Sequence, residues 1–405
     1  MPKPLAGARP RFLVIAYACV PGGGSEKGAG WAILKNLLSF ADCVAIVPDK
    51  HVDDLNSWID ESGATSLTVV GVDEGRLGSK LQKPRIPLFL AYLLWLREVE
   101  AMLPSLVALH QVDLVWHATY STFWLPTPIH QAAVPSVLGP IGGAVDAPDQ
   151  LVPLLSEKGR KLHRIDHVVT GGLARRAAVA RGLAAVDHVI VQNDETRREV
   201  DRYRAAGRPV SLLNHALGVD VPEATPTDLA AESFVWVGAM QERKGPELAI
   251  RALATVDEFT LVMVGGGPIL ERIKDLAVQL RVDDRVTFTG MLPRAEAVAI
   301  VAGAQGALFT GVHEEGGLAL AETLLLGIPT VVLAHGGART IAESATDSNR
   351  VRLVPVTRLD ALAADLGTAM KELATVGRAT GPLLDQDRFI SALEQAAESA
   401  TMVAP

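Results

Sequence analysis

The sequence has little cysteine, few aromatic residues and no long apolar run. Only two of its 405 residues are cysteines, Cys19 and Cys43, and we expect both to be small buried side chains, not a disulfide or metal pair. The longest charge-free apolar run, at residues 86–96, has eleven residues, whereas a membrane-spanning helix needs about 20. No secretory signal pattern precedes the first apolar segment at residues 11–17. We therefore expect a soluble, cytoplasmic protein whose only membrane contact would be peripheral, at the inner face.

Charge is also sparse and is unevenly spread. The net charge is −8, yet residues 1–217 carry 23 Lys and Arg against 21 Asp and Glu, so the acidic excess lies in the remainder. Residues 158–181 hold seven basic residues and a single acid, Asp166. This stretch is read either as a solvated face or as a rim that attracts an anionic acceptor or a membrane surface. The acidic balance and the lack of interleaved aromatics argue against nucleic acid as a partner.

Short apolar, β-rich runs alternate with helical patterns along the whole chain, which is typical of parallel sheets covered by helices. Residues 218–232 combine proline, acid and threonine without apolar periodicity and are expected to be a linker. We therefore expect two doubly wound α/β domains, at 1–217 and 233–385, followed by a C-terminal helix within 386–405. The expected strands are 11–17, 42–47, 67–72, 113–117, 135–139, 187–191 and a weaker 210–213 in the first domain, then 233–237, 259–264, 285–288, 306–309, 329–333 and 351–355 in the second.

The most informative segment is residues 310–334, which place Glu314 and Glu322 eight residues apart. Eight residues are a little over two helical turns, so the two carboxylates face nearly the same direction. Gly316 and Gly317 lie between them, and the amides of Gly317 and Leu318 fall at a helix N-terminus, where phosphate binds well. A site with an anion at its centre and hydroxyl groups at its ends matches the layout of a nucleotide sugar.

This segment resembles the element of two glutamates with seven residues between them in retaining family 4 (group 1) glycosyltransferases, which have the two-domain GT-B fold. Five further segments resemble family elements in the same order along the chain. They are residues 17–31, 137–144, 233–253, 261–280 and 285–301. The resemblance covers nearly the whole chain and implies two Rossmann-like domains facing a central cleft. It also implies that the second domain binds the donor and that the helix within 386–405 returns to the first domain.

The resemblance implies roles for residues of the second domain. Glu314 is expected to contact hydroxyl groups of the donor sugar, and Glu322 those of the ribose. The neighbouring Glu315 competes for the first role, but only Glu314 lies eight residues from Glu322. Lys244, in the Arg243-Lys244-Gly245 turn, is the expected cation that stabilises the leaving diphosphate. Leu292, in the loop at 290–293, is expected to contact the base through its backbone.

One position departs from the family pattern. An arginine commonly follows the glycine of the strand at 233–237, and this chain has Ala239. Either one cationic contact to the diphosphate is missing, or Arg243 supplies it. No Asp-x-Asp metal motif stands in a suitable context, because Asp53-Asp54 and Asp283-Asp284 fall in polar turns or at helix entries. We therefore expect no metal or other cofactor.

The first domain contributes glycine-rich loops. Gly23 and Gly24 precede a helix expected to begin near Gly28, and their backbone is expected to face the diphosphate. Weaker candidates on the acceptor side are Ser25, Gly142 and Gly143. His117 ends an apolar strand and resembles the histidine that some relatives place beside the reacting sugar. A buried structural histidine explains that position equally well.

The function expected from these features is retaining transfer of a sugar from a nucleoside diphosphate to an unidentified acceptor. The acceptor is expected to be a surface polysaccharide or glycolipid precursor, or a natural product. Three alternatives remain open: a sugar-nucleotide epimerase of the same architecture, a non-catalytic nucleotide-sugar-binding subunit, and a dinucleotide oxidoreductase. The last would use the glycine loop at 22–30 and Asp49, but position 27 is lysine and the G-x-G-x-x-G pattern is incomplete.

Overall fold

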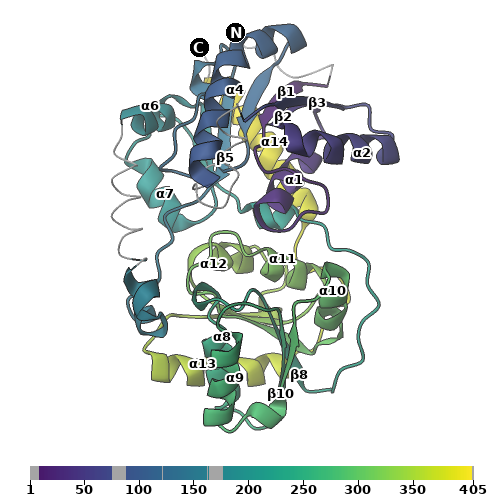
Figure 1. Ribbon diagram of the computed structural model, residues 1–405, viewed down its shortest axis with the longest axis vertical. Coiled ribbons are helices and arrows are strands. Elements are labelled where there is room, and N and C mark those ends of the chain that lie inside the picture. Colours follow the sequence, from purple (N-terminus) through teal and green to yellow (C-terminus); the bar gives the residue numbers. More distant parts are fainter. Residues whose placement is uncertain (1–8, 75–87, 121, 162, 164–176, 404–405) are drawn as a thin grey trace. The chain divides into compact units, whose positions relative to one another are not determined.

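The computed structural model describes residues 9–74, 88–120, 122–161, 163 and 177–403 of the chain. Two compact units account for it (Figure 1). Unit 1 comprises Met1–Ala144, Thr170–Gly218 and Gln386–Pro405, and unit 2 comprises Val145–Val169 and Val219–Asp385. Within the described ranges, every helix is too short or too polar to cross a membrane.

Unit 1 is built on a parallel sheet with the strand order β3-β2-β1-β4-β5-β6-β7. Its strands are β1 (Arg11–Ile15), β2 (Asp42–Pro48), β3 (Leu67–Val72), β4 (Leu114–His117), β5 (Ser136–Ile141), β6 (His188–Val191) and β7 (Val210–Leu212). Its helices are α1 (Ser25–Leu37), α2 (Val52–Ser62), α4 (Leu88–His110), α6 (Ala177–Ala185), α7 (Asp194–Asp201) and α14 (Gln386–Val403). The central strands β1, β4, β5 and β6 are almost entirely buried, which explains their continuous apolar sequences.

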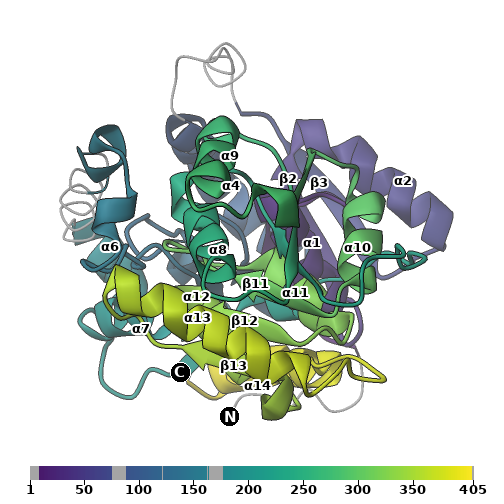
Figure 2. The same cartoon turned by 90° about the horizontal axis from the view of Figure 1, so that it is seen from below.

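Unit 2 is a second parallel sheet with the order β10-β9-β8-β11-β12-β13. Its strands are β8 (Ser233–Val237), β9 (Thr260–Val264), β10 (Val286–Gly290), β11 (Gly306–Phe309), β12 (Thr330–Leu333) and β13 (Val351–Val354). Its helices are α8 (Pro246–Leu253), α9 (Leu270–Gln279), α10 (Arg294–Gly303), α11 (Leu318–Leu325), α12 (Gly336–Glu343) and α13 (Leu359–Ala374). Helices α8, α9 and α13 cover one face of this sheet, and α10, α11 and α12 cover the other (Figures 1 and 2).

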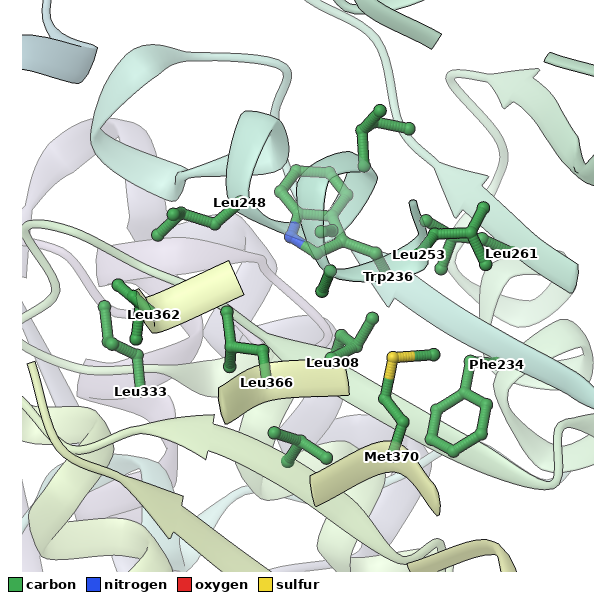
Figure 3. Close-up of a cluster of buried hydrophobic side chains, with 14 of the residues drawn as sticks. Phe234, Trp236, Leu248, Leu253, Leu261, Leu308, Leu333, Leu362, Leu366 and Met370 are labelled. Carbon is green, nitrogen blue, oxygen red and sulfur yellow. The ribbon is translucent and has the colours of Figure 1, made fainter. Parts of the chain in front are cut away.

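The core of unit 2 lies between its sheet and the layer of α8, α9 and α13. Phe234 and Trp236 from β8 point into this layer, where Leu248, Leu366 and Met370 meet them from the helices (Figure 3). These side chains are at most 2% exposed. Fully burying one such side chain stabilises the fold by about 1.5–3 kcal/mol, so this layer fixes the positions at which the strands end.

All thirteen expected strands are present, and their ends shift by two residues at most. Cys19 and Cys43 are free and buried, which confirms the expectation for both cysteines. The sequence-based boundary of the first domain, 1–217, needs a correction, because the segment at 145–169 belongs to unit 2. Its apolar side chains join the core of unit 2; they are Ala147, Leu151, Leu154 and Leu155. Helix α14 belongs to unit 1, where it contacts β5 and β6.

Candidate functional site

The site in unit 2 lies where the strand order reverses, between β8 and β11. In a doubly wound sheet, the connections that leave the two strands at this point diverge to opposite faces and open a crevice for ligands. The turn after β8 is the short 3-10 helix η5 (Glu242–Lys244), and the loop after β11 carries Glu314. The two residues that sequence analysis assigned to the reacting end of the donor therefore come from the two strands that border this crevice.

Lys244 and Glu314 form an ion pair in which Nζ of the lysine donates to Oε2 of the glutamate. The lysine side chain is 21% exposed and the glutamate side chain 7%, so the pair is partly shielded from water. The other glutamate oxygen, Oε1, accepts a hydrogen bond from the amide of Gly317 at 3.2 Å. A carboxylate bound by a cation and a helix N-terminus is already oriented before any substrate binds.

Backbone contacts hold the two loops together. The amides of Val312 and His313 both donate to the carbonyl oxygen of Arg243, at 2.9 and 3.0 Å. Gly245 adopts φ 62°, and a Cβ there would lie 2.1 Å from the carbonyl oxygen of Thr310. Only glycine fits this conformation and this close approach, which explains the glycine of the Arg-Lys-Gly turn. The position of the lysine is thus fixed by the backbone around it.

Glu322 lies on α11 and binds a residue that sequence analysis did not select. Its Oε1 accepts from Nε and Nη2 of Arg294, at 2.9 and 2.6 Å, and the same Nη2 donates to the carbonyl oxygen of Asp220 at 2.5 Å. Arg294 is the first residue of α10 and directly follows the loop that contains the half-buried Leu292. The ribose glutamate and the base loop expected from the sequence are therefore joined through one guanidinium group.

The glycines of the second loop shape the start of α11. Gly317 precedes the helix at φ 74°, and a Cβ there would lie 2.9 Å from Cδ1 of Ile341. Gly316 is buried, and Leu318 is the first residue of the helix. The backbone at this helix N-terminus is thus as compact as a phosphate-binding turn requires.

Arg243 and Ala239 occupy the turn after β8. Nε of Arg243 donates to Oε1 of Gln241 at 3.0 Å, on the exposed side of the turn. Ala239 is half-buried, and its carbonyl oxygen accepts from the amide of Gln241 at 2.7 Å. Lys244 is the cation of this turn that pairs with Glu314.

In unit 1, the glycine loop after β1 differs from the expectation in one respect. Helix α1 begins at Ser25 with Gly24 as its N-cap, not near Gly28. Gly28 and Gly30 lie within the helix, and both positions need glycine because the helix packs closely on the preceding loop. A Cβ atom at Gly28 would lie 2.2 Å from the carbonyl oxygen of Gly23, and one at Gly30 would lie 2.0 Å from that of Ala18. Such close approach outweighs the low helix propensity of glycine.

His117 ends β4 at the point where the order of the unit 1 sheet reverses. It is 1% exposed, and its two ring nitrogens lie 2.9 Å from the hydroxyl groups of Tyr92 and Thr127. Burial lowers the pKa of His117 to about 4, so the ring is neutral at pH 7. These two contacts within unit 1 give His117 a clear structural role.

The acceptor-side glycines follow β5. Gly142 forms an isolated β-bridge with Thr122, and Gly143 adopts φ 99° with its Cα against Trp124, where a Cβ would lie 2.7 Å from the indole nitrogen. The basic stretch is only partly described: Arg164, Arg175 and Arg176 lie outside the described residues. Among the residues that are described, no group of three His, Cys, Asp or Glu is placed to hold a metal ion.

Sequence reasoning missed two side chains around the site, Arg294 and Glu242. Arg294 binds Glu322, and Glu242 binds Ser156 of the segment at 145–161. Glu315, which sequence analysis weighed against Glu314 for the sugar-binding role, accepts from the amide of Val145 in the same segment. Glu242 lies two residues before Lys244 in the sequence, which is the one signal that would have drawn attention to it. The partners of Glu242 and Glu315 lie 86 and 170 residues away and could not be identified without the fold.

Comparison with known proteins shows which proteins this chain is similar to. Residues 222–373 match the family model described as glycosyl transferases group 1. The chain is 28% identical over 149 residues to a 2-deoxystreptamine glucosyltransferase of Streptomyces kanamyceticus, which covers 33% of this chain and 38% of the relative. It is 30% identical over 260 residues to a GDP-mannose-dependent α-(1-6)-phosphatidylinositol monomannoside mannosyltransferase of Mycobacterium tuberculosis, covering 59% and 63%. The matched part spans about 38% to 63% of the length of such relatives.

Solved structures share the fold over nearly the whole chain. Sucrose-phosphate synthase from Thermosynechococcus elongatus aligns with a TM-score of 0.55 at 17% identity, covering 96% of this chain and 98% of that one. The Anabaena protein Alr3699/HepE, solved with UDP, aligns with a TM-score of 0.53 at 13% identity, covering 96% and 100%. The fold class expected from the sequence, two Rossmann-like α/β domains of GT-B type, is therefore confirmed. Residues 222–373, the part of the chain that carries Lys244, Glu314 and Glu322, are thus similar to the group 1 glycosyl transferases.

Proposed function

We propose that the protein is a retaining, family 4 glycosyltransferase that takes a sugar from a nucleoside-diphosphate donor. The donor would bind at the reversal point of the unit 2 sheet. The observation that carries this proposal is the ion pair of Lys244 and Glu314, which joins the loops leaving β8 and β11. The pair places a cation and a hydroxyl-binding carboxylate side by side at the N-terminus of α11.

The leaving diphosphate sets the first chemical requirement. Negative charge on it grows as the glycosidic bond breaks, and a preorganised cation with helix amides stabilises that charge without a metal ion. We assign this role to Lys244, with the backbone of Gly316, Gly317 and Leu318 as the helix terminus. Gly23 and Gly24 of unit 1 would add backbone donors. In the donor complex, Lys244 would leave Glu314 and bind the diphosphate instead. Glu314 would then accept hydrogen bonds from hydroxyl groups of the sugar.

Retention of configuration is the second part of the proposal. A double displacement needs a carboxylate that is free to attack the anomeric carbon. The two carboxylates proposed to line the donor, Glu314 and Glu322, are assigned to hydroxyl groups of the sugar and of the ribose, and the sequence singles out neither as a nucleophile. We therefore favour attack by the acceptor on the face that the diphosphate leaves, with a phosphate oxygen taking the acceptor proton. A place for His117 beside the reacting sugar, which the resemblance implies, stays a prediction.

The nucleoside is assigned to the other end of the site. Glu322 would accept hydrogen bonds from the ribose hydroxyl groups while Arg294 holds its carboxylate in place. The backbone around Leu292 would contact the base. The acceptor would bind to unit 1, near Ser25, Gly142 and Gly143. The names of relatives include phosphatidylinositol mannosides and 2-deoxystreptamine as acceptors, so we propose a hydroxyl-bearing acceptor of the glycolipid or natural-product type. A glycolipid acceptor would bring the enzyme to the inner face of a membrane.

A donor-hydrolysis screen tests the proposal without an acceptor. The purified protein is incubated with UDP-, GDP- and dTDP-sugars, and release of the free nucleoside diphosphate is measured. One base should be preferred, and Lys244→Ala should lower the rate of release strongly, whereas Glu232→Gln, an exposed change in the same unit, should not. Interconversion of the donor sugar without release of diphosphate would instead show an epimerase, and binding without either reaction would show a non-catalytic subunit.

A further inference from the structure

The segment at residues 145–161, called the strap from here on, packs on unit 2 although unit 1 precedes and follows it in the sequence. Leu151 and Leu154 join the hydrophobic core of unit 2 and are at most 6% exposed. The strap is therefore an integral part of the domain that we propose to bind the donor.

The polar contacts of the strap converge on the two loops of the candidate site. Near its middle, the amide and the hydroxyl group of Ser156 both donate to Oε2 of Glu242, at 3.0 and 3.1 Å. The other oxygen of Glu242 accepts from Arg272 at 3.2 Å. Glu242 begins the turn that carries Lys244, and its carbonyl oxygen accepts the amide of Gly245 at 3.0 Å.

The start of the strap contacts the second loop. The amide of Val145 donates to Oε1 of Glu315 at 2.9 Å, and Nε2 of His335 donates to the carbonyl oxygen of Asp146 at 2.7 Å. Glu315 directly follows Glu314, whose own carbonyl oxygen accepts the amide of Gly337 at 2.9 Å. Each member of the Lys244–Glu314 pair thus has, within two residues, a carboxylate that binds the strap.

We propose that the strap positions the Lys244–Glu314 pair, with Glu242 and Glu315 as the positioning residues. Hydrogen bonds to a carboxylate are stronger than those between neutral groups. The bonds from Ser156 to Glu242 restrain the turn of Lys244, and the backbone bonds from the loop at 310–313 restrain the same turn. A lysine held in one geometry stabilises the developing charge at once, whereas a mobile lysine must first be ordered. The role of the pair in donor cleavage rests on the proposed function; its positioning by the strap does not.

Two substitutions weaken this restraint without touching the pair. Ser156→Ala removes one donor to Glu242, and Ser156→Thr restores a hydroxyl group. Gly159→Ala acts through a steric clash, because a Cβ there would lie 2.4 Å from Oε2 of Glu242 and would displace the carboxylate. The matched control is Gly381→Ala, where a Cβ meets nothing within 4 Å.

The experiment measures hydrogen–deuterium exchange of the full chain, together with donor hydrolysis. Ser156→Ala and Gly159→Ala should raise exchange in peptides covering 241–245 and 310–317 by about tenfold. Their kcat for hydrolysis should fall by a similar factor while KM changes little, and Ser156→Thr should recover both. A strap that only fills space would leave exchange and kcat at the level of Gly381→Ala, and that result would overturn the proposal. If wild-type protein hydrolyses no donor but exchange responds as stated, the positioning stands and the proposed function fails.

Discussion

Arg294 donates from two nitrogens to a single carboxylate oxygen of Glu322, at 2.9 and 2.6 Å. The glutamate side chain is 21% exposed and the arginine 39%, so water reaches the pair and its net contribution to folding stability is small. Its importance lies in geometry: both nitrogens hold the same oxygen, Oε1, so the end of the Glu322 side chain is kept in place on α11. A carboxylate held in this way is the basis of the ribose role that we propose for Glu322.

Glu322→Ala is expected to weaken binding of the bare nucleotide by about tenfold or more, since hydrogen bonds to a charged acceptor are worth about 1.5–3 kcal/mol. Arg294→Ala should weaken it less, because the carboxylate remains but is no longer oriented. Calorimetric titration with UDP and GDP measures both effects. Arg294→Lys serves as the variant that keeps the positive charge but lacks the planar guanidinium group with its two donors. If Glu322→Ala binds the preferred nucleotide as well as wild type, the ribose assignment is wrong.

Lys244→Ala is expected to lower turnover more than donor affinity. The charge on the diphosphate is largest in the transition state, so a cation aimed at it lowers kcat most when it is removed. Donor hydrolysis measured across a range of donor concentrations separates kcat from KM. The control is Arg358→Ala, which removes a cation of the same unit whose side chain is 85% exposed. A loss confined to KM would show that the lysine only binds the donor.

Activity is expected to survive removal of divalent cations. In the proposed mechanism, Lys244 and the N-terminus of α11 meet the diphosphate charge that a metal ion would otherwise neutralise. Donor hydrolysis after treatment with EDTA and desalting is the measurement, with a second sample to which magnesium or manganese is returned. An absolute requirement for either ion, restored on its return, would contradict the metal-free assignment.

The strands were predictable from the sequence because parallel strands covered on both faces read as continuous apolar runs. β8 and β11 are examples, and their ends locate Lys244 and Glu314 correctly at the reversal point. The strap was not predictable, because its buried leucines show neither a strand nor a long helical period and its partners lie far away in the sequence. The pairing of Arg294 with Glu322 is likewise a tertiary contact, between residues 28 positions apart on different helices.

The start of α1 was misplaced for a different reason. The helix was expected to begin near Gly28, and glycine has a low helix propensity. In the structure α1 begins at Ser25 and includes Gly28 and Gly30, and these positions hold glycine because the preceding loop passes too close for any side chain. Local propensity predicts loops well only where tertiary packing does not demand a small residue.

His117 should make stability depend on pH. Its folded pKa of about 4 lies below the usual value near 6.5, so its contribution is complete above pH 6.5 and is lost as the pH falls toward 4. The full loss is on the order of 3–4 kcal/mol, since the pKa falls from 6.5 to about 4 and each pKa unit corresponds to about 1.4 kcal/mol; about 2 kcal/mol of it should appear by pH 5. Urea unfolding at pH 7.5 and pH 5 should show a smaller difference for His117→Gln than for wild type. His188, also with a lowered pKa of about 4, remains in both proteins, so an equal pH dependence would mean that His117 is not buried neutral.

Gly245→Ala tests whether the turn of Lys244 depends on close backbone approach. Gly245 and Gly377 have similar left-handed conformations, with φ 62° and 73°, and both lie in unit 2. At Gly377 a Cβ meets nothing within 4 Å, so Gly377→Ala should cost only the conformational strain, about 1 kcal/mol. At Gly245 a Cβ would lie 2.1 Å from the oxygen of Thr310, so the loops must separate and the cost should reach about 3 kcal/mol or more. Thermal unfolding measures both variants, and nucleotide titration shows whether separation of the loops also weakens the site. Equal losses of Tm for the two variants would mean that the loops after β8 and β11 are not in contact as described.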